Sequence, residues 1–146
     1  MALYVLDTDI FSLLLNGDRQ VCERAVATPR AELAVTIVTV EESLTGWYAQ
    51  VRRARKVEAV IRAFSALQRF VEQLGRTRIL SFDMAAAAMA QTLRSNDRRV
   101  GTNDLRIAAI VLCHSGVLVT RNTSDFSRFT DLIIEDWSLP EPQASR

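Results

Sequence analysis

Acidic side chains stand at several places along the chain where they could take part in catalysis. Asp7 and Asp9 directly follow the apolar residues 3–6. The other candidates lie further along the chain and are Glu41, Glu42, Asp104 and Asp125. Carboxylates that converge without cations repel one another, and some of them must take up protons to stay together. A divalent cation would compensate that charge, and Mg²⁺ or Mn²⁺ prefers a shell of carboxylate and water oxygens.

The elements that carry these acids follow from the hydrophobic pattern, in which short apolar runs alternate with longer segments of helical periodicity. Strands are expected at 3–7, 33–40, 78–82, 117–120 and 131–136. Helices are expected at 8–17, around 21–26, at 83–96 and 102–116, with two more between 40 and 75 that Gly46 separates. Thr8 or Asp9 is expected to cap the first helix.

Buried strands that alternate with helices indicate a parallel sheet covered on both faces, because parallel neighbours need a crossover and unbroken apolar runs need two apolar faces. We therefore expect an α/β fold with a parallel sheet of about five strands between helices. A single domain is expected over residues 1–137, followed by a mobile tail at 138–146.

Most of the acids fall where the expected strands end. Asp7 ends the first strand, Glu41 and Glu42 follow the second, and Asp125 follows the fourth. Asp104 joins them if its helix starts at the same edge, which is where ligands bind in open α/β sheets. Each acid alone could simply stabilise a helix N-terminus. Their joint placement is what favours a metal site.

Composition narrows the class of protein without fixing it. The 146 residues carry a net charge of +1, so any nucleic-acid contact depends on a local patch. Cys22 and Cys113 lie far apart and form no zinc or disulfide pattern. His114 is the single histidine, which excludes a ribonuclease built on a histidine pair. With no signal segment or membrane span in view, a cytoplasmic protein without a membrane partner is expected.

Three stretches of the sequence resemble the successive motifs of a known family. They are YVLDTDIFSLL, VTIVTVEESLTG and VGTNDLRIAAIVLCHSGVLVTRNTSDFSRFTDLIIEDW. Together they look like the PIN-domain ribonucleases, specifically the VapC toxins of bacterial and archaeal toxin–antitoxin pairs. The resemblance implies a small α/β/α sandwich, Mg²⁺ or Mn²⁺ as cofactor, RNA as substrate, a homodimer, and a VapB antitoxin that wraps the toxin and blocks its cleft.

The resemblance also assigns roles to individual residues. Those expected to be catalytic and to hold the metal are Asp7, Glu42, Asp104 and Asp125. Glu42 is chosen over Glu41 because the family pattern places the acid four residues before a glycine, here Gly46. Asp9 is expected to support the site or to cap the helix, and Thr120 and Asn122 to orient a metal-bound water or to hold the loop. EES in place of AEL and TND in place of PND remove no acid.

The expected function is a metal-dependent endoribonuclease toxin that leaves 5′-phosphate and 3′-hydroxyl ends. Two alternatives remain. The DxD of residues 7–9 also opens haloacid-dehalogenase-like phosphatases, but those need a downstream lysine and a late acidic pair, and the one lysine, Lys56, lies in an amphipathic segment. A catalytically inactive PIN-like binding module is the other.

Arginines are the candidates for contact with RNA phosphates. Those nearest the expected cleft are Arg98, Arg99, Arg106 and Arg121. A second basic stretch consists of Arg52, Arg53, Arg55 and Lys56. It is either solvated helix surface or a contact for RNA or antitoxin.

Overall fold

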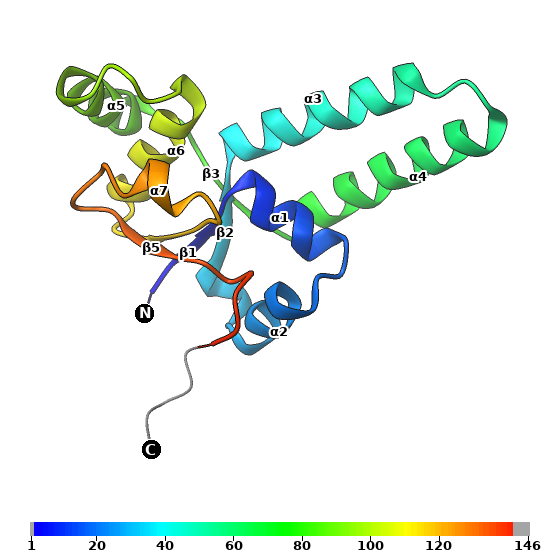
Figure 1. Ribbon diagram of the computed structural model, residues 1–146, viewed down its shortest axis with the longest axis horizontal. Helices are drawn as coiled ribbons and strands as arrows, with labels where there is room; N and C mark the ends of the chain where they lie inside the picture. The colour runs from blue at the N-terminus through cyan, green and yellow to red at the C-terminus, as the bar shows by residue number, and fades with distance from the viewer. Residues whose placement is uncertain (1, 142–146) are drawn as a thin grey trace.

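A computed structural model, which describes residues 2–141, contains a five-stranded sheet with helices on both faces (Figure 1). The strands are β1 (Tyr4–Leu6), β2 (Leu33–Thr36), β3 (Arg78–Leu80), β4 (Val117–Val119) and β5 (Ile133–Glu135). They are ordered β3-β2-β1-β4-β5, and every neighbouring pair is parallel. The expected α/β fold with a parallel sheet of five strands is therefore confirmed.

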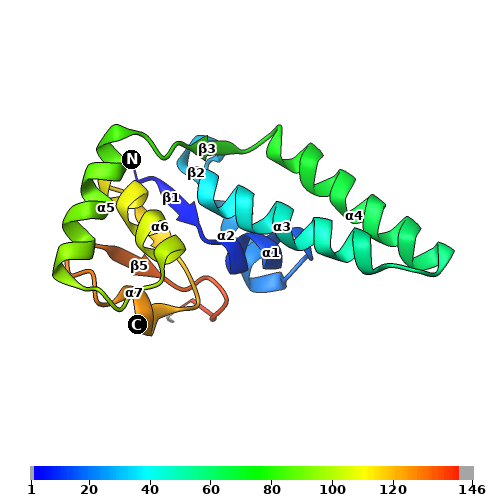
Figure 2. The ribbon, with the colours of Figure 1, turned by 90° about the horizontal axis from the view of Figure 1, so that it is seen from above.

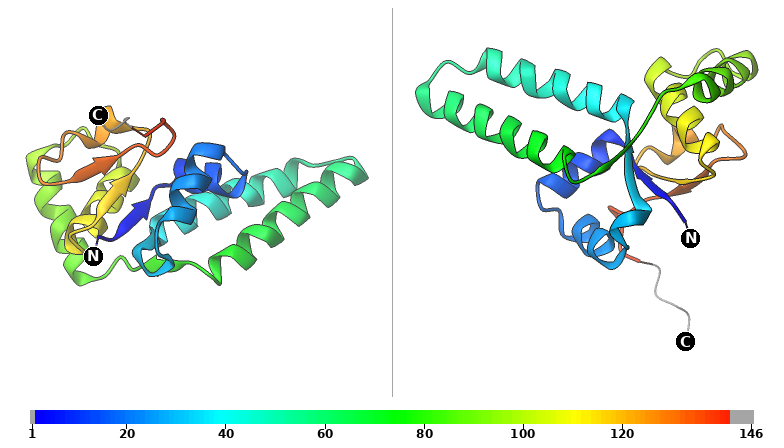
Figure 3. Two further views of the ribbon diagram at one scale, coloured as in Figure 1. Left: turned by 90° about the horizontal axis from the view of Figure 1, so that it is seen from below. Right: turned by 180° about the vertical axis from the view of Figure 1, so that it is seen from behind.

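Seven α-helices connect the strands. They are α1 (Thr8–Leu15), α2 (Arg19–Ala27), α3 (Ile37–Arg53), α4 (Val57–Leu74), α5 (Met84–Asn96), α6 (Thr102–Cys113) and α7 (Thr123–Phe126). Helices α5, α6 and α7 lie on one side of the sheet, and α1 to α4 lie on the other (Figures 1 and 3). Helices α3 and α4 run side by side as a hairpin that projects away from the sheet (Figure 2).

The sheet separates two hydrophobic cores, because successive strand residues point to opposite faces. The residues that alternate are Val5, Ala34 and Leu118 towards α5 and α6, and Leu6, Val35 and Val119 towards α1, α2 and α4. All six are almost fully buried. Burial on both faces holds the strands rigidly and fixes where their carboxyl ends lie.

Two boundaries predicted from the sequence are wrong. The second strand ends at Thr36 rather than at residue 40, because the Thr36 hydroxyl accepts the backbone N–H of Thr39 at 3.1 Å and caps α3. Gly46 does not break the helix, which continues to Arg53. A glycine inside a helix costs about 1 kcal/mol relative to alanine. Packing of α3 against α4 outweighs that cost.

The first helix cap is also corrected, since Asp7, not Thr8 or Asp9, caps α1. Helix α7 and a short 3₁₀ helix (Arg30–Glu32) were not expected from periodicity. Residues 142–146 of the expected tail lie outside the described residues, and the end of the domain at 137 stays a prediction. Among residues 2–141, no helix combines the length and the apolar character needed to cross a membrane.

Candidate active site

Asp7 lies at the carboxyl end of β1 and is one of the few buried polar residues. Its Oδ1 accepts the backbone N–H of Ile10 at 2.9 Å, which fixes the side chain against the first turn of α1. The pKa of Asp7 is raised to about 6, first by burial and to a smaller extent by the nearby charges of Asp9 and Asp104, which together outweigh the lowering effect of hydrogen bonds from Ile10 and Thr120. The ionised form of Asp7 is therefore disfavoured in the folded protein.

Asp104 stands in the first turn of α6 and lines a small pocket together with Asp125. Its pKa is raised, first by burial and then by the carboxylates of Glu42 and Asp125. Because Asp104 also acts on Asp7, it is the electrostatic link among the four acids. The structure therefore brings these four side chains to one edge of the sheet, called here the carboxylate edge.

Glu42 is positioned by a threonine on the neighbouring helix. The Thr8 hydroxyl lies 2.8 Å from Glu42 Oε1 and 3.2 Å from the Thr39 hydroxyl, so it ties the start of α1 to α3. Glu41 instead is exposed and accepts a hydrogen bond from Thr45 on its own helix. The geometry thus places Glu42, and not Glu41, at the carboxylate edge.

Asp125 is positioned through the turn that follows β4. The side-chain amide of Asn122 donates to Asp125 Oδ2 at 2.9 Å, and the backbone N–H of Asn122 donates to the Thr120 hydroxyl at 2.9 Å. Thr120 is fully buried, and its side chain lowers the pKa of Asp7. Thr120 and Asn122 therefore link the surroundings of the first acid to those of the last.

The arginines near these acids fall into two groups. Arg99 and Arg128 line a small pocket of about 80 Å³ together with Asp104 and Asp125. Both also approach Asp97, at 4.0 and 3.3 Å. Arg121 lies 4.0 Å from the exposed carboxylate of Asp9.

The second group consists of Arg98 and Arg106. They line a separate open groove of about 1000 Å³ between α5 and α6, called here the α5–α6 groove. The four arginines proposed for RNA contact are therefore divided between two neighbouring surfaces.

Carboxylate oxygens make up the donor set of the edge, which suits Mg²⁺ or Mn²⁺ better than softer metals. Within residues 2–141, no three acidic, histidine or cysteine side chains stand close enough together to enclose an ion. Mg²⁺ usually keeps several of its waters and takes only one or two carboxylates directly. Together with the raised pKa values of Asp7 and Asp104, the residues fit a hydrated divalent cation.

Two contributors to the site were missed in the sequence. Thr8 was considered only as a helix cap, although a hydroxyl between two aspartates at a strand end could have suggested contact with another acid. Arg128 gave no local signal, because only the turn after α7 brings it to the pocket of Asp104 and Asp125. The site is thus a carboxylate-lined edge with arginines at its rim.

Known proteins are similar to this chain in both sequence and fold. The PIN-domain profile matches residues 4–132. Ribonuclease VapC1 of Haemophilus influenzae (strain R2866) is 30% identical over 138 residues, which cover 93% of this chain and 98% of that protein. The tRNA(fMet)-specific endonuclease VapC of Shigella flexneri is 26% identical over 142 residues, covering 94% of this chain and 100% of that protein.

Among solved structures, VapBC-1 from nontypeable Haemophilus influenzae matches with 26% identity and a TM-score of 0.67, over 94% of this chain and 99% of that chain. The sequence profile and the relatives agree over almost the full length. The chain therefore belongs to the PIN-domain family and, within it, to the VapC group.

Proposed function

We propose that this chain is an endoribonuclease toxin that hydrolyses RNA phosphodiester bonds with the help of Mg²⁺ or Mn²⁺. The observation that carries the proposal is that Asp104 lies within electrostatic range of Asp7, Glu42 and Asp125 at one edge of the sheet. The relatives named ribonuclease or endonuclease support the reaction class. Neither the phosphatase nor the inactive binding module has comparable support.

Each residue has a distinct part in this proposal. The four acids of the carboxylate edge would hold the cation, with Asp7 fixed most rigidly by the Ile10 N–H. A bound cation lowers the pKa of water and stabilises a leaving oxygen in an in-line displacement. Thr8, Thr120 and Asn122 hold the carboxylates in place. Arg99 and Arg128, beside Asp104 and Asp125, are placed to draw the RNA phosphate towards the acids.

Cleavage of RNA in the presence and absence of Mn²⁺, Mg²⁺ and EDTA tests this function. The probes are total RNA and initiator tRNA, the latter because one relative is named for it. Wild-type protein should release fragments with 5′-phosphate and 3′-hydroxyl ends, and chelation should stop the release. Asp7→Asn should abolish it, since asparagine keeps the helix cap but removes the charge.

Asp9→Asn is the matched control, because Asp9 is two residues away and its side chain is 72% exposed, but it lies outside the four acids. Its cleavage should remain within about threefold of the wild type. Equal RNA end maps for the wild type and Asp7→Asn would overturn the nuclease proposal. Rapid release of phosphate from a phosphate monoester would instead support the phosphatase alternative.

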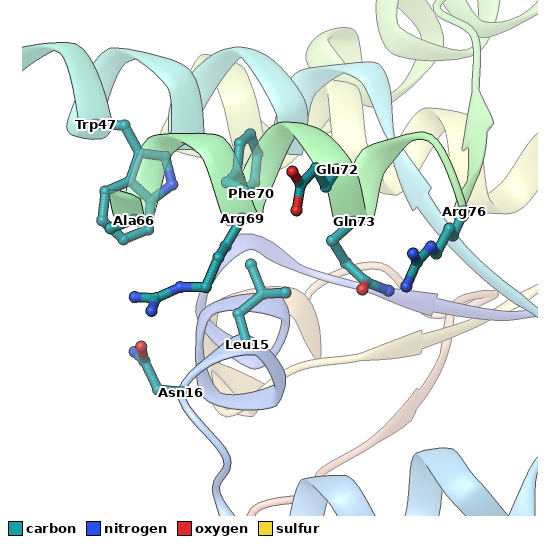
Figure 4. A pocket seen from close by; sticks show the side chains of 9 residues that line it. All are labelled: Leu15, Asn16, Trp47, Ala66, Arg69, Phe70, Glu72, Gln73 and Arg76. Atoms are coloured by element: carbon teal, nitrogen blue, oxygen red, sulfur yellow. The ribbon is translucent and has the colours of Figure 1, made fainter. Parts of the chain in front are cut away.

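We further propose that a VapB-type antitoxin binds along the hairpin. A pocket of about 250 Å³ lies where the end of α1 meets α3 and α4, with Leu15, Trp47 and Phe70 as apolar walls (Figure 4). Arg69 and Arg76 stand at its two ends (Figure 4). A second hollow shares Ala66 and Arg69 with it and continues along α4.

The two hollows form one continuous surface, called here the hairpin groove, and arginines lie along it. Arg62 and Arg69 are seven residues apart and so lie on one side of α4, and Arg76 follows in the turn after Leu74 and lines the same pocket as Arg69. An apolar floor with a row of arginines suits an amphipathic segment that carries acidic residues. The solved relative whose name contains both VapB and VapC supports this choice of partner.

Charge reversal separates this surface from the carboxylate edge. Arg62→Glu with Arg69→Glu should weaken binding of the VapB-type protein from the same host by at least about tenfold, while RNA cleavage stays unchanged. Arg78→Glu, an exposed arginine on β3, is the control. Unchanged affinity in the double variant would place the antitoxin elsewhere. A homodimer, as the resemblance implies, and a cytoplasmic location, as expected from the sequence, complete the proposal; sedimentation tests the homodimer.

A further inference from the structure

The α5–α6 groove is lined by arginines and apolar side chains, as the hairpin groove is, but it shares residues with the pocket at the carboxylate edge. Of the described residues that line it, three are arginines and none is acidic. Ala87 and Ala90 of α5 contribute only methyl groups, so the two helices leave an open trough with an apolar floor. Gln91, Ser95 and Thr102 add polar groups along its walls.

Phe82 is the aromatic residue of this groove. It follows β3, which is parallel to β2, so it leaves the sheet at the same edge as the four acids. Its ring is 39% exposed, which is unusual for a phenylalanine beside a strand end. The guanidinium carbon of Arg106 lies 5.8 Å from the ring centre, within the range of a cation–π contact.

The arginines of the groove are not equivalent. Arg94 donates to the backbone carbonyls of Val100 at 2.7 Å and Arg98 at 3.3 Å, so it shapes the loop before α6. Arg98 and Arg106 are exposed and have no carboxylate partner within residues 2–141. Two guanidinium groups thus remain available beside an exposed aromatic ring.

The groove joins the carboxylate edge at the start of α6. Val100 and Gly101 line both the α5–α6 groove and the small pocket that contains Asp104 and Asp125. Gly101 presents no side chain at this junction, and a methyl group there would come within 3.9 Å of Asp104 Oδ2. A chain held at the acids can therefore continue past Gly101 into the groove.

We propose that the α5–α6 groove binds the RNA strand beside the bond that is cut, with one nucleobase stacked on Phe82 and Arg106. Single-stranded nucleic acid is commonly held by aromatic rings under the bases and cations along the phosphates. Phe82 supplies the ring, Arg106 extends the stacking plane, and Arg98 contacts phosphate. This inference rests on the proposed function, because it takes the carboxylate edge as the place of cleavage.

Binding of single-stranded RNA to the Asp7→Asn protein, which should not cut it, tests the proposal. The probes are a fluorescein-labelled oligouridine decamer, an oligoadenine decamer, and an abasic decamer with the same sugar–phosphate backbone. Phe82→Leu should weaken binding of the base-containing probes by about tenfold. It should leave the abasic probe unchanged, because phosphate contacts remain.

Three controls keep the result specific to stacking. Phe82→Trp should restore or increase affinity, since it retains an aromatic face. Tyr48→Leu removes an exposed aromatic residue of α3 and should change nothing. Arg98→Gln should weaken all three probes alike, because it removes a phosphate contact.

Loss of affinity for the abasic probe as well, or no loss for any probe, in Phe82→Leu would overturn the stacking site. Wild-type cleavage is measured separately with the same oligonucleotides. Cleavage that is unaffected by Phe82→Leu in KM and in the position of the cut would also overturn it, while leaving the proposed nuclease intact. Absence of cleavage by the wild type would instead count against the proposed function, whatever the binding shows.

Discussion

The carboxylate edge and the α3–α4 hairpin expose two different kinds of surface, one acidic and one apolar. At the edge, burial first and neighbouring carboxylates second raise the pKa of Asp7 and of Asp104. On the hairpin, α4 carries an outer apolar row, Val57, Ile61, Phe64 and Val71, each more than half exposed. The first surface has like charges close together, and the second lacks apolar cover.

The difference shows what each region is able to bind. Charge crowded at a rigid edge is relieved by a cation, because the strands and the caps prevent the carboxylates from moving apart. Exposed apolar side chains on a projecting hairpin are typically buried against another protein chain. Catalysis and regulation would thus occupy separate surfaces of this small chain, and changes to one should leave the other intact.

After the loss of cleavage expected for Asp7→Asn, the largest effect is expected from Glu42→Gln. Glutamine keeps the shape and the contact with Thr8 but removes one charge, so cleavage should fall by about 10² to 10³-fold. Antitoxin affinity should stay the same, because the hairpin groove is untouched. Measuring kcat for RNA cleavage and the antitoxin Kd in parallel checks both halves of the comparison.

Glu41→Gln is the matched control for that experiment, since Glu41 points to solvent one residue earlier in the same helix. Its kcat should remain within about twofold of the wild type. A larger loss in Glu41→Gln than in Glu42→Gln would mean that the wrong glutamate has been assigned to the edge.

Asp7→Asn should make the cation-free protein more stable at alkaline pH. A folded-state pKa of about 6 against an ordinary value of 3.8 means that ionised Asp7 opposes folding. This destabilisation is absent below the ordinary pKa, grows with pH, and is complete above pH 6, where it amounts to about 1 to 3 kcal/mol. Tm in EDTA at pH 8 should therefore rise by roughly 3 to 10 °C in the variant.

The same melts at pH 4.5 provide the check on the sign. There the gain from Asp7→Asn should shrink, because Asp7 of the wild type is largely protonated in the folded state. Mn²⁺ at pH 8 should stabilise the wild type more than the variant. A variant less stable than the wild type at pH 8 in EDTA would show that Asp7 is not under electrostatic stress.

Asn122→Ala should have a smaller effect, on cleavage alone. The change removes the amide that holds Asp125 but leaves the backbone N–H that bonds to Thr120. Loss of such a supporting contact should lower kcat by about tenfold with little change in KM. Ser127→Ala in the same segment, where only a local hydroxyl bond is lost, is the control. Unaltered kcat in Asn122→Ala would mean that Asp125 needs no orientation.

The carboxylate edge was predictable because it depends on general rules. Parallel strands end at one edge, so Asp7 and Asp125 had to meet there, and a helix returning along the sheet brings Asp104 to them. The register at Thr36 was not predictable, because residues 37–40 are β-branched and favour a strand until the Thr36 cap and the packing of α3 decide otherwise.

The α5–α6 groove could not be read from the sequence for a different reason. Phe82 and Arg106 lie 24 positions apart, and their contact depends on the order of the strands and on the close packing of two alanine-containing helices. Periodicity gives the existence of each element but not its neighbours. Pairs such as Thr8 with Glu42 are likewise visible only once the elements are placed.

The smallest effect is expected on the outer face of the hairpin, from Phe64→Lys. The ring is 54% exposed, so its loss should change the free energy of unfolding by no more than about 0.5 kcal/mol in the isolated chain. Phe70→Ala, on the inner face of the same helix against Phe11 and Trp47, should by contrast cost about 3 to 5 kcal/mol.

Thermal melts of the wild type and both variants at two protein concentrations test whether a second copy of the chain covers the outer apolar row of α4. If a second copy of the chain covers α4, the wild-type Tm rises with concentration and Phe64→Lys removes that rise, because dimerisation stabilises only the folded state. A Tm that is independent of concentration in both proteins assigns the row to a partner of another kind. A loss near that of Phe70→Ala in dilute Phe64→Lys would mean that the row is part of the core, and the contrast between edge and hairpin would fail.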